Sequence, residues 1–237
     1  MPGLKIGLVT TAIYLVIVAI GLALIHQVDQ GAYGTPDMVR RFWVVELILT
    51  ALTLFVALRY FGWAAAGFGR LNVSALIWVL PAYSVLAVMI WDVWPSLTEI
   101  SASLLFFLAL TTLLIGFSEE LMFRGILLRG AMTRLSVIQA MMLSAVAFSV
   151  LHVFNGFAGQ SLDGTLQHVA FTFLIGFALA PIALKLGNLW PLIIWHWLWN
   201  FALFAGSITD VIYPYAFAGI LLQVIISIWL WTETIRN

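Results

Sequence analysis

The chain has 237 residues, of which 64% are hydrophobic and only 8% carry a charge. Because soluble domains are about 45–50% apolar and about 25% charged, a soluble fold of this length could not bury so much apolar surface, and the composition indicates an integral membrane protein. The net charge of zero gives no indication of nucleic acid as a partner, and the absence of cysteine excludes disulfides, thiolate nucleophiles and cysteine metal sites.

Eight apolar runs follow one another along the chain. A helix that spans the bilayer needs about 20 apolar residues, with a range of about 17–25. The runs that meet or approach this length are 6–25, 42–58, 73–91, 101–118, 135–151, 169–184, 189–208 and 211–231. Their continuous apolarity favours helices over a β-barrel, and the runs after the first argue against a cleaved signal peptide. We therefore expect an all-α polytopic protein, a single transmembrane domain over 1–237 with about eight transmembrane helices.

Basic residues are distributed unevenly between the two sides that eight spans define. One side carries only Arg40 and Arg41, and the other carries Lys5, Arg59, Arg70, Arg124, Arg129, Arg134, Lys185 and Arg236. Cytoplasmic loops accumulate Lys and Arg, so both termini are predicted to be cytoplasmic. The acidic residues agree with this orientation, since most of them are expected on or near the side opposite the termini: Asp29, Asp37, Glu46, Asp92, Glu99, Asp163 and Asp210.

Three ionisable residues occur at the end of the fourth run, and such residues inside a bilayer are costly and usually functional. Glu120 and Arg124 are four residues apart and share a helix face, with the acid N-terminal, which favours an ion pair. Glu119 lies about 100° away around the helix, so it is left unpaired. An unpaired carboxylate in a low dielectric is a candidate general base. The alternative is that the cluster lies among the cytoplasmic headgroups, where Glu and Arg are tolerated.

Polar residues also occur in two later runs. His152 comes one helical turn after Phe148, which we expect to pack on the same face. His196 and Asn200 are four residues apart inside the seventh run and therefore point the same way. A lone intramembrane His or Asn usually makes interhelical hydrogen bonds, and His152 alone would be a core histidine. Two such side chains on one face, His196 and Asn200, make a functional site an alternative to purely interhelical hydrogen bonding.

One carboxylate and two imidazoles support two mechanisms of amide hydrolysis. In the first, Glu119 activates a water molecule, and His152 and His196 orient it or transfer protons. Asn200 then donates a hydrogen bond to the developing oxyanion. In the second, Glu119, His152 and His196 bind a divalent metal ion such as zinc, with water in the open position. The residue types leave both mechanisms open.

Other intramembrane chemistries lack their motifs in this sequence. It has no His-Glu-x-x-His, no Gly-x-Ser-x-Gly and no pair of intramembrane aspartates. His26 and His168 lie at span edges and are assigned no chemistry. Two other classes of protein stay open as alternatives. One is a small proton-coupled transporter or channel, although no repeat is visible. The other is a non-catalytic membrane protein that regulates a partner or confers bacteriocin immunity.

The three polar clusters together resemble a known family. Its pattern is Glu-Glu-x-x-x-Arg, then Phe-x-x-x-His, then His-x-x-x-Asn or Asp, and the chain matches it in order with Glu119, Glu120, Arg124, Phe148, His152, His196 and Asn200. The family is that of the CPBP (CAAX-processing and bacteriocin-processing, or Abi) intramembrane proteases, which include the type II CAAX prenyl endopeptidases. The motif-bearing protease core covers about 100–205.

The resemblance implies an all-helical fold with a catalytic cavity that faces the cytoplasm. It also implies hydrolysis of a peptide bond, with Glu119 activating water and Glu120 supporting Arg124. A divalent metal such as zinc and a metal-free glutamate mechanism are both proposed for such proteins. The substrate would be a membrane-associated peptide or protein, lipidated or transmembrane. The compact, loop-poor chain is typical of a bacterial cytoplasmic membrane protein.

Overall fold

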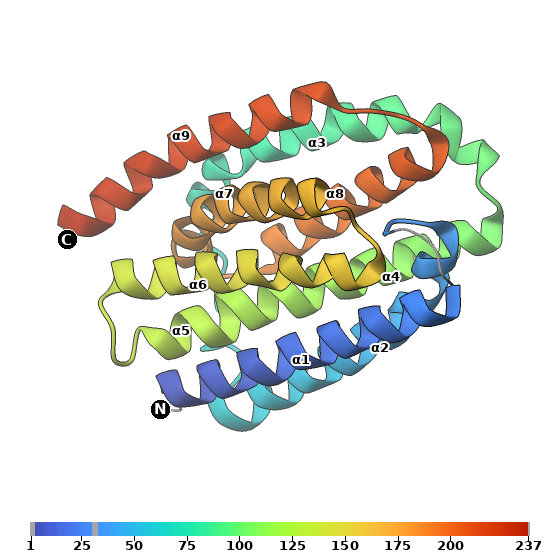
Figure 1. Ribbon diagram of the computed structural model, residues 1–237. Helices are drawn as coiled ribbons and strands as arrows, with labels where there is room; N and C mark the ends of the chain where they lie inside the picture. The colour runs from blue at the N-terminus through green and yellow to red at the C-terminus, as the bar shows by residue number, and fades with distance from the viewer. Residues whose placement is uncertain (1–2, 30–32, 237) are drawn as a thin grey trace.

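The computed structural model describes residues 3–29 and 33–236, and almost all of them are helical (Figure 1). The α-helices are α1 Leu4–Asp29, α2 Pro36–Val56, α3 Leu80–Val93, α4 Ala102–Glu120, α5 Leu128–Ala131, α6 Val137–Leu151, α7 Leu162–Leu186, α8 Trp190–Thr209 and α9 Pro214–Arg236. Two π-helical segments, Ala57–Phe61 and Leu121–Leu127, and three 3₁₀ segments, Val73–Trp78, Pro95–Glu99 and His152–Ala158, continue or connect them. No strand occurs among the described residues, so the all-α prediction is confirmed.

Seven of the described helices are long and apolar enough to cross a membrane, and α3 is a shorter apolar helix. The expected start of the third span at residue 73 is wrong, because residues 73–78 form a 3₁₀ segment and α3 begins only at Leu80. Pro81 stands in the first turn of α3, where its missing N–H and its clash with the preceding turn favour a helix start. The 14 residues of α3 cover about 21 Å at 1.5 Å per residue, less than a bilayer core of about 30 Å.

The helices run alternately in opposite directions, so that both ends of the chain lie at the same end of the bundle, on the left in Figure 1. Helix α4 lies inside the bundle and packs against α2 on one side and α8 on the other. Helix α7 packs against α6 and α9, and α3 packs against α8 and α9. The motif-bearing helices α4, α6 and α8 are therefore brought together by the inner part of the bundle.

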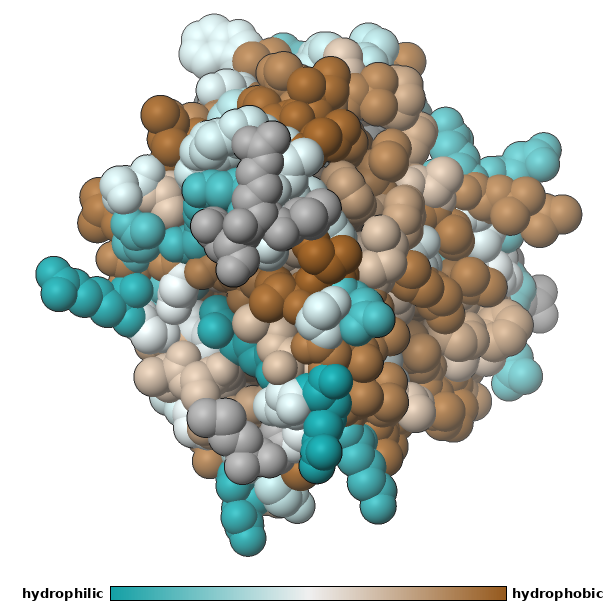
Figure 2. Space-filling view, turned by 90° about the vertical axis from the view of Figure 1, so that its left-hand side faces the viewer, coloured by the Kyte–Doolittle hydropathy of each residue, from teal (hydrophilic) through white to brown (hydrophobic). Residues whose placement is uncertain are grey.

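The two ends of the bundle differ in charge. We call the end with both termini the basic end, because the helix ends and connections there carry Lys5, Arg59, Arg70, Arg129, Arg134 and Lys185. Figure 2 looks at this end and shows hydrophilic side chains projecting from it. We call the opposite end the acidic end, where Asp37, Asp92, Glu99, Asp163 and Asp210 occur together with Arg40 and Arg41. Arg124, which the sequence count placed on the basic side, is fully buried inside the bundle.

Candidate active site

A glycine brings the two central site helices together. Gly116 lies on α4 one turn before Glu119 and Glu120, and a Cβ atom there would come within 2.8 Å of the backbone nitrogen of Trp197 on α8. The indole N–H of Trp197 donates to the carbonyl of Ala109, over 3.0 Å, and links the same two helices about two turns before Gly116 on α4. Because the backbones approach so closely, the carboxylates of α4 lie beside the polar stripe of α8.

Glu120 is the central hydrogen-bond acceptor of the site. Its Oε1 accepts from Nη1 of Arg124 and faces Nδ1 of His196, each at 3.0 Å. Both Glu120 and Arg124 are completely buried, and His196 is 6% exposed. Since the acceptor is a carboxylate, Nδ1 of His196 carries the proton in this contact. The expected i,i+4 pair between Glu120 and Arg124 is present, and it also orients the imidazole.

Glu119 stays outside this ion pair, as the helical spacing predicts. The residue is 7% exposed, and its Oε2 has no hydrogen-bond partner within the described part of the chain. Nε2 of His196 lies 3.7 Å from this oxygen, which is too far for a direct hydrogen bond. A water oxygen can lie within about 2.8 Å of both atoms at this separation. The two acids thus have different surroundings: Glu120 is paired with Arg124 and His196 through Oε1, whereas Glu119 has no ion pair with Arg124 and its Oε2 has no direct partner within the described residues.

Arg124 lies in the π-helical segment Leu121–Leu127 that follows Glu120 without a break. Such π-turns inside helices occur frequently at functional sites. The guanidinium carbon lies 4.1 Å from the ring centre of Phe148, so the charge is stabilised by the aromatic face as well as by Glu120. The same ring contacts His152 and His196 edge-on, with centroids 5.1 Å and 5.9 Å away. Phe148 therefore connects all three polar clusters.

His152 ends helix α6 and begins the 3₁₀ segment. Its Nδ1 lies 2.9 Å from the carbonyl oxygen of Phe148, one turn earlier. A carbonyl can only accept, so Nδ1 is the protonated nitrogen and Nε2 is left free as an acceptor in the neutral ring. The start of α6 is fixed by a capping box between Ser136 and Gln139, which sets the register that brings His152 to the site.

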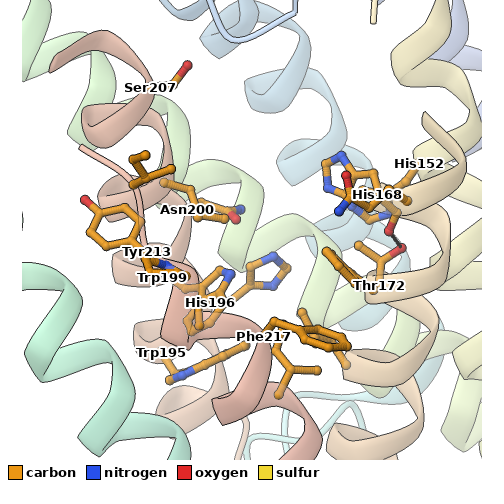
Figure 3. A pocket seen from close by; sticks show the side chains of 18 of the residues that line it. His152, His168, Thr172, Trp195, His196, Trp199, Asn200, Ser207, Tyr213 and Phe217 are labelled. Carbon is orange, nitrogen blue, oxygen red and sulfur yellow. Dashed lines mark hydrogen bonds between the residues drawn. The ribbon is translucent and has the colours of Figure 1, made fainter. Parts of the chain in front are cut away.

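Two adjoining cavities meet at these residues, and Figure 3 shows side chains that line the outer one. The inner cavity, about 170 Å³, contains Glu119 and extends to Tyr33 and Gly34. The outer cavity, about 670 Å³, contains His196 and Trp199 and lies between α7, α8 and the start of α9. Both cavities are lined by His152, His168, Asn200, Leu203 and Ser207. All the predicted catalytic residues, Glu119, His152, His196 and Asn200, therefore line one continuous region.

Sequence analysis missed several polar residues of this region. Glu46 was expected near the acidic side, yet it is 1% exposed, lines the inner cavity and accepts from the Ser118 hydroxyl over 2.8 Å. The Tyr14 hydroxyl lies 2.8 Å from the same Ser118 oxygen. Glu46 is the fifth residue of the predicted run 42–58, so it lies inside a span and not in a connection, and this position was the signal for a buried carboxylate.

His168 was assigned no chemistry because the sixth span was expected to begin at residue 169. Helix α7 begins seven residues earlier, at Leu162, after the capping residue Ser161. His168 is therefore inside the helix, with its ring centre 4.7 Å from that of His152 and its Nδ1 3.0 Å from the amide nitrogen of Asn155.

Tyr33 lies at the wall of the inner cavity. Burial and, to a smaller extent, the charges of Glu119 and Glu46 raise the pKa of Tyr33, so its phenol keeps its proton and can act as a donor.

A metal site would need Glu119, His152 and His196 to converge on one point. Among the described residues, no three His, Asp or Glu side chains are grouped closely enough to bind a metal ion. His196 directs Nδ1 at Glu120 and His152 directs Nδ1 at a backbone carbonyl, which leaves Nε2 of each ring available. One free nitrogen is all that a histidine ligand needs, so the ring orientations do not decide between the two mechanisms. Within the described residues, Glu119, His152 and His196 do not form a preassembled group of three metal ligands.

The fold and the site define a polytopic membrane protein with a carboxylate–histidine centre buried between its helices. Residues 101–202 match the family model described as type II CAAX prenyl endopeptidase Rce1-like. The matched segment contains all three motifs, so the resemblance to the CAAX-processing proteases is confirmed. Neither the curated proteins nor the solved structures gave a match to the chain.

Proposed function

We propose that this protein is an intramembrane endopeptidase that hydrolyses a peptide bond with water activated by Glu119. The observation that carries the proposal is the unsatisfied Glu119 carboxylate, 3.7 Å from His196, within a segment that matches a protease family. A carboxylate that is buried, free of a counter-ion and next to an imidazole is suited to removing a proton from water.

The reaction begins with a water molecule placed between Oε2 of Glu119 and Nε2 of His196. Glu119 takes one proton as the water oxygen attacks the carbonyl carbon of the peptide bond, which gives a tetrahedral oxyanion. When the C–N bond breaks, the protonated Glu119 returns this proton to the leaving nitrogen. The second proton of the water stays on the new carboxyl group, so the products are a carboxylic acid and an amine, and Glu119 ends as the carboxylate. The new acid then passes its proton to the amine, which gives a carboxylate and an ammonium group.

The oxyanion needs hydrogen-bond donors that are already in place. The side-chain amide of Asn200 lines both cavities, one helical turn from His196 on the same face. It is the donor that we assign to the oxyanion. His152 lies across the cavity with Nε2 free, and we assign it to holding the water molecule or the substrate carbonyl.

The remaining motif residues position this machinery. Glu120 holds His196 by Nδ1, so that Nε2 turns toward Glu119. Arg124 neutralises Glu120 from a fully buried position, and Phe148 covers the guanidinium. Without this support the imidazole could rotate, and the water position between it and Glu119 would be lost.

The test uses purified protein in detergent and a library of quenched fluorescent peptides with apolar sequences. We expect Glu119→Gln to keep its thermal unfolding midpoint and to lose about 10²–10⁴-fold in kcat, the range of general-base catalysis. Exhaustive chelation should leave the wild type active. Unimpaired cleavage by Glu119→Gln would overturn the proposal. Loss of activity on chelation, with recovery on adding zinc, would replace the metal-free mechanism by the metal-dependent one.

A further inference from the structure

The cavities and the chain termini lie at opposite ends of the bundle. The rim of the outer cavity is formed by exposed residues at the start of α7, the end of α8 and the connection to α9, namely Gln167, Ser207, Ile212 and Pro214. The inner cavity extends to Tyr33 and Gly34, in the connection from α1 to α2. All of these segments belong to the acidic end, on the right in Figure 1.

The site is closed toward the basic end. Each residue from Glu120 to Leu128 is buried, so the part of the motif helix between Glu119 and the basic end has no contact with solvent or lipid. On α8, Leu192 and Ile193, which precede His196 on the basic side, are completely buried as well. Access to Glu119 is therefore from the acidic end, through the two cavities.

The charge distribution indicates which end faces the cytoplasm. The basic end carries Lys and Arg in its connections and at its helix ends, whereas Arg40 and Arg41 are the only Lys or Arg residues among the described residues of the acidic end. Cytoplasmic connections are enriched in these residues, and membrane insertion follows this bias. The predicted cytoplasmic termini and the cytoplasm-facing cavity implied by the family resemblance conflict, because the termini and the cavity lie at opposite ends of the bundle.

We propose that the catalytic cavity opens to the extracytoplasmic side of the membrane and takes polypeptide segments presented from that side. The lining supports an apolar, uncharged segment as occupant. No Asp, Glu, Lys or Arg occurs among the described residues that line the outer cavity, and exposed Leu203, Ile212 and Phe217 form part of it. Such a substrate is an extracytoplasmic peptide, or the outer part of a membrane-embedded chain, and not the tail of a cytoplasmic protein.

The orientation can be tested without any assumption about catalysis, because the chain contains no cysteine. Two matched variants carry one cysteine each. Ser207→Cys places it on the wall shared by both cavities, and Ser74→Cys places it on the exposed 3₁₀ segment at the basic end. Bacterial spheroplasts that express either variant are treated with a membrane-impermeant maleimide before and after permeabilisation.

We expect Ser207→Cys to be labelled in intact spheroplasts and Ser74→Cys only after permeabilisation. The reverse pattern, or equal labelling of both before permeabilisation, would overturn the extracytoplasmic opening. The nature of the substrate rests on the proposed function, and a second arm tests it separately. Proteoliposomes with the orientation fixed by this labelling receive the apolar fluorescent peptides from the outside. Cleavage when the acidic end faces outward, and its loss in Glu119→Gln, supports the inference.

A failure of the proposed orientation can be distinguished from a failure of the proposed peptidase activity. Labelling as expected with no cleavage from either face would contradict the proposed peptidase activity and leave the orientation standing. Cleavage only when the basic end faces outward would overturn the direction of substrate entry and leave the peptidase activity standing.

Discussion

Nδ1 of His196 lies 3.0 Å from Oε1 of Glu120, although 76 residues separate the two in the sequence. This contact joins α4 to α8 at the point where Gly116 allows them to approach. It also determines which ring nitrogen of His196 is available for chemistry, because the nitrogen bound to the carboxylate carries a proton. The second glutamate of the motif therefore acts on the proposed reaction through the histidine.

Replacing Glu120 with Gln should destabilise the protein strongly. Arg124 would keep its full burial and lose its counter-ion, and breaking a buried pair in this way costs about 3–5 kcal/mol. Thermal unfolding in detergent measures the effect. The double variant Glu120→Gln/Arg124→Met removes the unpaired charge, so it should recover part of the stability but not the activity. A Glu120→Gln protein with the midpoint of the wild type would contradict the structural role of this pair.

Phe148→Leu should weaken the support of Arg124. The substitution removes an aromatic face 4.1 Å from the guanidinium, and a desolvated cation–π contact contributes about 2 kcal/mol. We expect a lower unfolding midpoint together with a lower kcat, since the same ring also contacts both site histidines. Phe157→Leu is a suitable control, because Phe157 is exposed and its ring contacts Phe154 and not Arg124. Equal effects of the two substitutions would argue against a specific role for Phe148.

Gly116→Ala should separate α4 from α8. The added methyl group would meet the backbone of Trp197 at 2.8 Å, and backbone atoms cannot move aside as the end of a side chain can. We expect kcat to fall by at least about tenfold, because misplacing a catalytic group by 1 Å can cost about 10²-fold. Gly156→Ala provides the comparison, since its nearest neighbour would be 3.8 Å away. Similar kinetics for both variants would show that close helix contact is not needed.

Asn200→Leu should reduce kcat by about 10²–10³-fold with little change in KM, because an oxyanion donor acts mainly on the transition state. Leucine keeps the approximate size of the side chain and removes the amide. Ser207→Ala, on the same helix and lining the same cavities, should have kinetics close to those of the wild type. A large increase in KM with unchanged kcat for Asn200→Leu would assign this residue to substrate binding instead.

The parts of the site that follow helical spacing were predictable from the sequence. The Glu120–Arg124 pair and the separation of Glu119 from it depend on positions within a single helix, and the structure has both. The link from Glu120 to His196 joins two helices, and no spacing rule gives it. Segment ends were the weakest predictions. Helix α3 begins later than expected, and the early start of α7 places His168 inside a helix and not at its edge.

Glu46 shows a different limit of sequence analysis. It was grouped with the acids of the acidic side, because a single carboxylate without a motif gives no indication of a partner. Its partners, Ser118 directly and Tyr14 through that hydroxyl, come from two other helices and are ordinary residues within apolar runs. Only the packing of α1, α2 and α4 makes this hydrogen-bond network recognisable.

The uncharged lining of the outer cavity has a consequence for the sequences that could be cut. A charged side chain that enters this cavity loses its water and finds no counter-ion among the residues that line it, which costs several kcal/mol. Charged residues of a substrate would therefore stop at the rim, and their distance from the scissile bond would be set by the depth of the cavity. The depth of the cavity would then set the number of residues between the nearest charge of the substrate and the cleaved bond. No particular side chain would have to be recognised at the bond itself.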